Sequence, residues 1–150
     1  MADLKFVRFQ SEDYELYKAW CEDEEIRRWF GPATTEWRDY VILSQSSFMW
    51  MIYDGNEPVA NIQVDLSEGN SSKAHLAFMV RPGFRRKGYG RQVLLLALEQ
   101  PELCDVRCFY ASVEPANTAS VGVLSSTSYT MTSPEPDEDG FIEYTYVRSI

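Results

Sequence analysis

The chain has 150 residues, of which 45% are hydrophobic and 25% are charged, as in one ordinary globular domain. We expect residues 1–150 to form a single domain, and no apolar run reaches the roughly 18–20 residues of a membrane span. The net charge of −9 argues against nucleic acid as a partner, because phosphate binding needs a basic face. The same charge is compatible with a cationic partner, although acidity that only maintains solubility is an equal alternative.

The N-terminal residues 1–5 lack the basic start and apolar core of a signal peptide, so we expect a cytoplasmic protein without a membrane partner. Cys21, Cys104 and Cys108 form an odd and sparse set, which favours reduced thiols over a disulfide framework. Cys104 and Cys108 could begin a zinc site, but the chain has one histidine and no second cysteine pair. We therefore expect no metal.

The first third of the chain predicts one strand and three short helices. Alternation over residues 4–9 predicts the strand, and Ser11 is expected to cap the first helix. An acidic run at 22–25 begins the second helix, which Gly31-Pro32 ends. Thr34 or Thr35 begins the third. Large aromatic side chains of these helices are more often core than ligand-binding: Trp20, Trp29, Trp37 and Tyr40.

The middle of the chain predicts three consecutive strands at residues 48–53, 58–66 and 74–80. They are joined by a turn at 54–56 and a polar loop at 67–72, and the third strand is apolar enough to be central. The remaining elements are helices at 88–100 and 117–126, strands at 106–113, 130–133 and 141–147, and an acidic turn at 134–140. This order predicts an α/β fold with a central mixed, mostly antiparallel sheet flanked by helices.

A basic cluster stands between the central strand and the helix that follows it. Residues 81–91 hold five of the 14 basic residues of an acidic chain: Arg81, Arg85, Arg86, Lys87 and Arg91. Gly88 and Gly90 let the backbone approach a ligand closely, and the helix start supplies free N–H groups. These features predict a pyrophosphate site, with a solvated basic turn as the alternative. The Gly-Lys-Ser/Thr of a Walker loop and the glycine spacing of a dinucleotide loop are both absent.

Two motifs resemble the GNAT superfamily of N-acetyltransferases. Arg85-x-x-Gly88-x-Gly90 after Val80-x-Pro82 is similar to the coenzyme A loop of that family, and Val113-x-Pro115-x-Asn117-x-x-Ser120 is similar to its asparagine–serine helix. The resemblance covers nearly the whole chain. At Val123-Leu124 and at residues 20–29, the chain resembles the branch with ribosomal-protein N-terminal and aminoglycoside acetyltransferases. The resemblance implies the GNAT fold and an acyl-CoA-dependent N-acetyltransferase.

The resemblance also implies acetyl-CoA as co-substrate and gives roles to individual residues. The pantetheine arm would bind backbone groups of Met79 and Val80, and the Val80 N–H would polarise the acetyl carbonyl as a catalytic donor. Asn117 would contact the cofactor or its bound water while also capping a helix. The implied cofactor-binding residues are Met79, Val80, Arg85, Arg86, Lys87, Gly88, Tyr89, Gly90, Arg91 and Asn117.

The usual proton-transfer residues of the family are missing from their usual places. Leu124 stands where many members have a tyrosine acid, and Ser128 replaces a glycine. By alternation the strand face shared with Val80 is apolar, so His75 lies on the opposite face. His75 and Tyr110 remain catalytic candidates, with Glu114 as a weaker one.

The acceptor is expected to be a primary amine of a small molecule, protein or peptide. A lysine-like amine with a pKa of about 10.4 needs roughly 4–5 kcal/mol to be neutral at pH 7, whereas an α-amine needs about 1 kcal/mol. Without an obvious base, a less basic amine or a water relay is favoured. The alternative function is a GNAT-fold sensor or interaction module that binds acyl-CoA without turnover. A homodimer is left open.

Overall fold

The computed structural model describes residues 3–30, 32–133 and 135–148. They contain one seven-stranded sheet in the order β1-β2-β3-β4-β5-β7-β6. The β4–β5 pair is parallel and all the other pairs are antiparallel, so the predicted mixed, mostly antiparallel sheet is confirmed. The strands are β1 (Leu4–Arg8), β2 (Ser47–Asp54), β3 (Glu57–Ser67), β4 (Asn70–Val80), β5 (Cys108–Val113), β6 (Thr130–Ser133) and β7 (Ile142–Val147). The helices are α1 (Tyr14–Cys21), α2 (Glu24–Phe30), α3 (Thr35–Leu43), α4 (Tyr89–Ala97) and α5 (Thr118–Ser125), with 3₁₀ turns η1 (Ser11–Asp13) and η2 (Pro101–Leu103).

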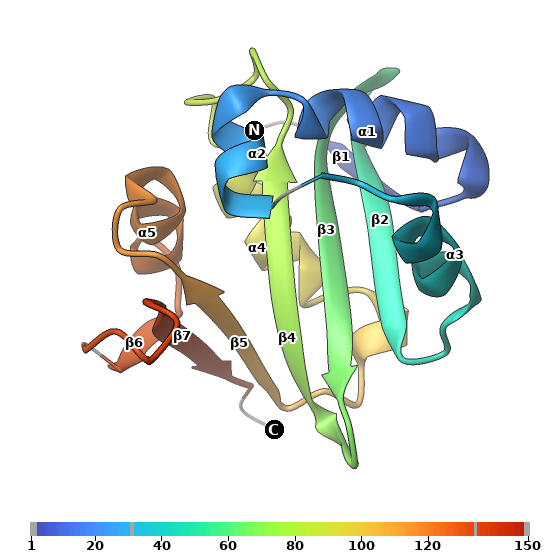
Figure 1. The fold of residues 1–150 in the computed structure, drawn as a ribbon. Helices are drawn as coiled ribbons and strands as arrows, with labels where there is room; N and C mark the ends of the chain where they lie inside the picture. The colour runs from blue at the N-terminus through green and yellow to red at the C-terminus, as the bar shows by residue number, and fades with distance from the viewer. Residues whose placement is uncertain (1–2, 31, 134, 149–150) are drawn as a thin grey trace.

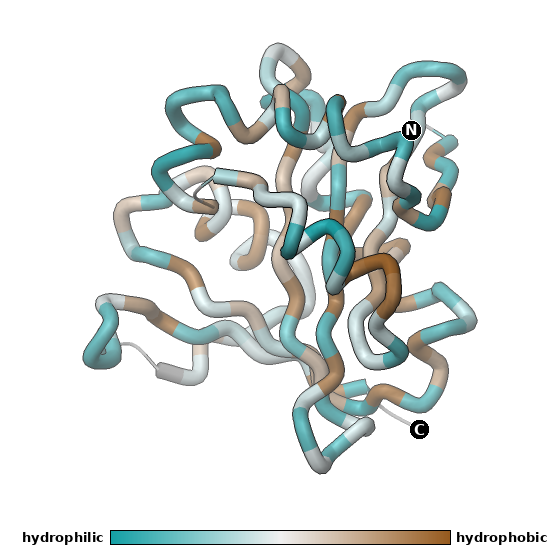
Figure 2. Tube along the Cα trace, turned by 45° about the vertical axis from the view of Figure 1, so that its right-hand side comes forward, coloured by the Kyte–Doolittle hydropathy of each residue, from teal (hydrophilic) through white to brown (hydrophobic). Residues whose placement is uncertain are grey.

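Helices cover the two faces of the sheet and create two apolar cores. Helices α1–α3 lie on one face of β1–β4, and α4 lies on the other (Figure 1). Alternation along β4 divides its side chains accordingly: Leu76 joins the core under α4, and Met79 joins the core under α1–α3. Figure 2 shows hydrophilic colours on many outer turns, and hydrophobic colours on parts of both the strands and the helices. No helix in the described ranges is long and apolar enough to cross a membrane.

The structure corrects the start of the first helix and confirms that of the third. The predicted cap at Ser11 is wrong, because Ser11 lies inside η1 and Gln10 precedes it. The Asp13 carboxylate accepts a 2.9 Å hydrogen bond from the Gln10 N–H and closes that turn. Of the two predicted starts of the third helix, Thr34 is the cap of α3 and accepts from the Trp37 N–H at 3.1 Å. Gly31, the predicted end of the second helix, lies outside the described residues.

The hairpin between β3 and β4 is tighter than the polar loop predicted at residues 67–72. Ser67 and Asn70 are register partners, and Gly69 occupies a left-handed conformation with φ of 75° that suits a tight turn. The predicted central position of β4 is confirmed, because three strands lie on each side of it. Pro134, at the start of the predicted acidic turn, lies outside the described residues.

The aromatic residues of the first helices divide between core and surface. Trp20 is buried, and Trp37 stacks on Tyr17 with ring centroids 4.7 Å apart, so both belong to the core. The core expectation is wrong for Tyr40, which is 57% exposed. Trp29 is half-buried and lines a cavity described below.

We expect Thr34→Ala to lower the free energy of unfolding by about 1 kcal/mol, because it removes the side-chain cap of α3. Urea denaturation of the variant measures this loss. Thr35→Ala is the control, because Thr35 is also exposed and is not the cap. Equal losses in the two variants would contradict the capping role.

Candidate active site

The parallel strands β4 and β5 part from one another partway along their length. They are paired only from Lys73 to His75 on β4 and from Cys108 to Tyr110 on β5. Beyond this rung β4 continues to Val80 and β5 to Val113, and the two strands diverge (Figure 1). Buried backbone groups in a sheet normally have partners. The divergence therefore leaves an edge of β4 that a ligand can bind.

Hydrogen bonds at the two ends of β4 identify the backbone groups on this edge. The Arg81 N–H donates to the Val59 carbonyl on the β3 side at 2.8 Å, and the Ser72 carbonyl accepts from Arg107 on the β5 side at 2.7 Å. Strand alternation then turns the N–H groups of Phe78 and Val80 toward the opening and that of Met79 toward β3. This geometry supports the position predicted for Val80. It favours Phe78 over Met79 for the second backbone contact.

The loop that follows β4 exposes backbone N–H groups at the start of α4. Arg86 has a φ of 65° and Gly88 a φ of 82°, and Arg86 is the one non-glycine residue with positive φ in the described ranges. Left-handed residues within a turn direct successive N–H groups into an anion-binding concavity. The first turn of α4, beginning at Tyr89, adds N–H groups without intrahelical acceptors and a positive dipole end. The loop fits a pyrophosphate.

Two residues of the loop motif also hold α4 in place. A Cβ at Gly90 would lie 3.3 Å from a methyl group of Val123 and 3.6 Å from the Phe78 ring, so the glycine allows α4 to pack closely on its neighbours. The Tyr89 hydroxyl donates to the Asp54 carboxylate at 2.6 Å. That hydrogen bond raises the pKa of Tyr89 above its usual value. It ties the start of α4 to the β2–β3 turn, a contact that sequence reasoning missed.

Helix α5 forms the other wall of the site. The Asn117 side chain accepts from the Ser120 N–H at 3.3 Å, which confirms its predicted cap. The Arg91 guanidinium donates to the Ser126 carbonyl at 3.3 Å and joins α4 to the end of α5. Leu124 is buried in the core, so the position of the family tyrosine faces no solvent-filled site.

A cavity of about 460 Å³ joins the cofactor loop to α2 and α5. It brings together Arg85 and Asn117, both predicted to bind the cofactor. The Arg85 guanidinium donates to the Asp23 carboxylate at 2.9 Å and lies 3.4 Å from that of Glu25. The hydrogen bond from Arg85 lowers the pKa of Asp23 below its usual range. The acidic and basic runs were both visible in the sequence, but only the tertiary fold pairs them.

Trp29 lines this cavity, and its indole is partly buried. The Trp29 Nε1 is buried and has no hydrogen-bond partner within the described part of the chain. A buried N–H without an acceptor costs about 1–3 kcal/mol.

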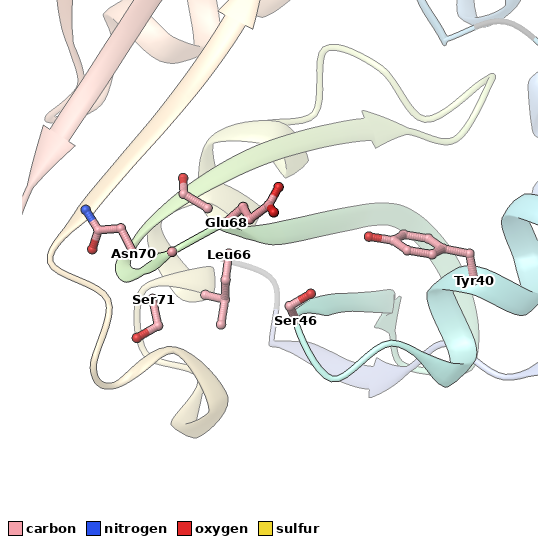
Figure 3. A pocket seen from close by; sticks show the side chains of 8 residues that line it. Tyr40, Ser46, Leu66, Glu68, Asn70 and Ser71 are labelled. Atoms are coloured by element: carbon pink, nitrogen blue, oxygen red, sulfur yellow. The ribbon is translucent and has the colours of Figure 1, made fainter.

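A larger cavity of about 630 Å³ lies at the opposite end of β4 from the cofactor loop. Tyr40 and Ser46 face the β3–β4 hairpin across it (Figure 3). Its remaining lining belongs to residues 66–71. We assign no chemistry to this cavity, because the divergent strand ends and the basic loop are both at the far end of β4.

His75 and Tyr110 lie at the closed end of the opening. They form the last paired rung of β4 and β5, and their rings meet edge to face at 5.1 Å. Burial lowers the pKa of His75, while Asp65 and Glu143 act in the opposite direction. Val80 is five residues further along the strand, a span of about 16 Å. The two predicted catalytic side chains are therefore near each other but distant from the predicted carbonyl donor.

The other site predictions concern charge and metal. Glu114 directly follows β5 and lies before α5. Among the described residues it forms no hydrogen bond with His75 or Tyr110. No cluster of three or more His, Cys, Asp or Glu side chains in the described ranges could hold a metal ion. The three cysteines are unpaired there.

Comparison with known proteins gives the class of this molecule. The model of the acetyltransferase (GNAT) domain matches residues 3–129, so the chain belongs to the GNAT acetyltransferase family. A relative named uncharacterized N-acetyltransferase YfmK, from Bacillus subtilis (strain 168), is 29% identical over 140 residues, which covers 92% of this chain and 93% of the relative. Family membership confirms the predicted fold and supports acyltransferase activity that uses acetyl-CoA.

Solved structures extend the likeness of fold. Spermidine N-acetyltransferase from Vibrio cholerae, in complex with CoA and spermine, has a TM-score of 0.82 at 12% identity, covering 96% of this chain and 95% of that one. Aminoglycoside N(6')acetyltransferase from Legionella pneumophila subsp. pneumophila str. Philadelphia 1 has a TM-score of 0.79 at 17% identity, with 98% and 93% covered. At these identities the likeness concerns the fold alone.

We expect Gly88→Ala to weaken coenzyme A binding by more than tenfold, because a Cβ strains the left-handed conformation on which the loop depends. Isothermal titration calorimetry measures the affinity. Gly69→Ala is the matched control, since Gly69 also has a positive φ with open space around it but lies in the β3–β4 hairpin. Equal affinities in the two variants would contradict the role of the loop.

His75 also predicts a pH dependence of stability. Its pKa is lower in the folded protein, so the unfolded chain binds more protons as the pH falls through about 6.5. The free energy of unfolding should therefore decrease from pH 7 to pH 5, and His75→Gln should reduce that decrease. Urea denaturation at both pH values tests this, and an unchanged decrease in the variant would contradict it.

Proposed function

We propose that this protein transfers an acetyl group from acetyl-CoA to a primary amine, by direct attack of the amine on the thioester. The observation that carries the proposal is one continuous path of available N–H groups. The path runs from the open edge of β4 at Phe78 and Val80, through the left-handed loop, to the first turn of α4. An extended pantetheine arm ending in a pyrophosphate has the shape and the acceptor groups that such a path requires.

Residues of this path have distinct roles in the proposal. Backbone N–H groups from Arg86 to Arg91 hold the pyrophosphate, and Asn117 contacts the cofactor or its bound water. The Val80 N–H polarises the thioester carbonyl and stabilises the negative charge that develops on its oxygen. Alignment of the amine against the thioester supplies most of the rate.

The acceptor is proposed to be a small-molecule amine that enters beside α2. The chain carries a net charge of −9, and on its α2 side the cavity at Arg85 is lined by three carboxylates, Asp23, Glu24 and Glu25, and by one arginine, Arg28. Such a field attracts a cation and raises its rate of encounter. Two proteins of the same fold are named for spermidine and aminoglycoside acetylation, and both substrates are amines.

Proton removal from the amine is proposed to run through water. Leu124 is buried where many family members have a tyrosine, and His75 is too far from Val80 for direct contact. Burial keeps the pKa of His75 low, so that its imidazole is neutral and able to accept a proton at pH 7. A less basic amine would need this help least.

A panel of polyamines, aminoglycosides and peptides, incubated with acetyl-CoA and monitored by thiol release, tests the function. Turnover with at least one amine is the expected result. Binding of acetyl-CoA without turnover on any amine would favour the sensor or interaction module, to which the missing tyrosine lends support. Absence of acetyl-CoA binding in calorimetry would contradict both.

We expect Val80→Pro to lower kcat by about 10²–10³-fold, because it deletes the N–H that faces the thioester. The N–H faces away from β3, so the β3–β4 ladder keeps its hydrogen bonds. Val80→Ala is the control, since it shortens the same side chain and keeps the N–H. A loss of kcat in Val80→Ala as large as in Val80→Pro would contradict the role of the backbone donor.

A pH profile separates the two routes of proton removal. If the water route uses His75, His75→Ala lowers kcat/KM and removes the acidic limb of its profile. If the amine loses its proton without a base, the variant keeps the wild-type profile. Steady-state kinetics from pH 5 to pH 9 with the best amine of the panel distinguishes these outcomes.

A further inference from the structure

Arg85 is bound to carboxylates of α2 instead of being free to meet a phosphate. Its Nη2 donates to Asp23 at 2.9 Å, and its Nη1 lies 3.4 Å from Glu25. The Arg85 and Asp23 side chains are 33% and 27% exposed, so the pair is only partly screened by water. Guanidinium binds carboxylate and phosphate through the same planar fork of donors. The carboxylates of α2 thus occupy groups that a pyrophosphate would use.

Asp23 is held in place because it also caps the start of α2. The Oδ2 atom that accepts from Arg85 also accepts from the Ile26 N–H at 3.2 Å, and the Asp23 carbonyl accepts from Arg27 at 2.8 Å. Movement of Asp23 would remove these bonds from the start of α2. Arg85 stands on a long flexible side chain and makes no other hydrogen bond in the described ranges. In any exchange of partners, therefore, Arg85 moves and Asp23 stays.

Three of the other four basic residues of the loop have printed contacts away from α2. Arg81 pairs with Glu57 on β3 at 3.1 Å, Lys87 lies over the Phe84 ring, and Arg91 donates to Ser126. Within the described part of the chain, Arg85 is thus the basic side chain of residues 81–91 that joins the cofactor loop to α2.

We propose that Asp23 and Glu25 are an internal competitor for the Arg85 guanidinium, so that the protein without cofactor holds its phosphate-binding loop in a self-inhibited state. The inference rests on the proposed function, because it assumes that the loop binds the pyrophosphate of acetyl-CoA. Arrival of the pyrophosphate draws Arg85 away from α2 and leaves both carboxylates unpaired in the shared cavity.

The competition predicts that removing the competitor tightens cofactor binding. Asp23→Asn deletes the charge and keeps a side-chain oxygen that caps α2, because asparagine is as good an N-cap as aspartate. Glu25→Gln deletes the second charge. Glu24→Gln is the matched control, since Glu24 lines the same cavity and forms no ion pair within the described residues. Calorimetric titration with coenzyme A gives the affinity of each variant and of the unmodified protein.

We expect Asp23→Asn to raise the affinity for coenzyme A by roughly three- to tenfold and Glu25→Gln by roughly two- to threefold, in line with a partly exposed ion pair. Glu24→Gln should change the affinity by less than Glu25→Gln does. Weaker binding in Asp23→Asn and in Glu25→Gln would overturn the inference, because it would mean that the ion pairs hold the loop in its binding shape. Equal effects in Glu24→Gln and Glu25→Gln would also overturn it, because charge alone would then suffice.

The same titrations separate this inference from the function on which it rests. Failure of the unmodified protein to bind coenzyme A would overturn both. Binding by the unmodified protein with no gain in Asp23→Asn or Glu25→Gln would overturn the inference alone. If Asp23→Asn unfolds, Glu25→Gln and its Glu24→Gln control decide the matter, because neither side chain caps α2.

Discussion

The separation of β4 from β5 is the constraint on which the rest of the site depends. The strands share three paired positions and then diverge, so the end of β4 has a partner only on the β3 side. Backbone groups in the middle of a sheet are ordinarily consumed by the ladder. Here those of Phe78 and Val80 face the opening between β4 and β5, and α5 and the loop before α4 lie next to that opening (Figure 1). The core under α4 contains side chains of both strands, Leu76 of β4 and Phe109 of β5 among them.

The loop after β4 is basic, although the chain as a whole is acidic. Basic residues are concentrated on this loop. In the folded protein, carboxylates at the start of α2 form ion pairs with one of them, Arg85. The backbone N–H groups of the loop carry no net charge and remain available to an anion. If the loop binds an anionic cofactor, as proposed, the affinity depends on backbone geometry at Arg86 and Gly88 as much as on side-chain charge.

The sequence predicted features that depend on residues close together along the chain. Asn117 was recognised as a cap, the start of α3 was narrowed to Thr34 or Thr35, and the apolar character of β4 predicted its central position. Ser11 was misassigned because the turn already begins at Ser11, with Gln10 before it and Asp13 accepting from the Gln10 N–H. The contacts that long-range packing decides were missed: no pattern of spacing connects Asp23 with Arg85 or Tyr89 with Asp54. The choice between Phe78 and Met79 required the register with β3, which the sequence alone does not specify.

The most direct test of the account is amide NMR of the ¹⁵N-labelled protein during titration with coenzyme A. The account predicts that the N–H signals of Phe78, Val80 and residues 86–91 shift strongly. Signals of the β3–β4 hairpin around Gly69, at the far end of β4, should stay in place. Shifts confined to the hairpin cavity, or titration without any change at Val80 and the loop, would contradict the claim that the divergent edge of β4 and its loop hold the donor.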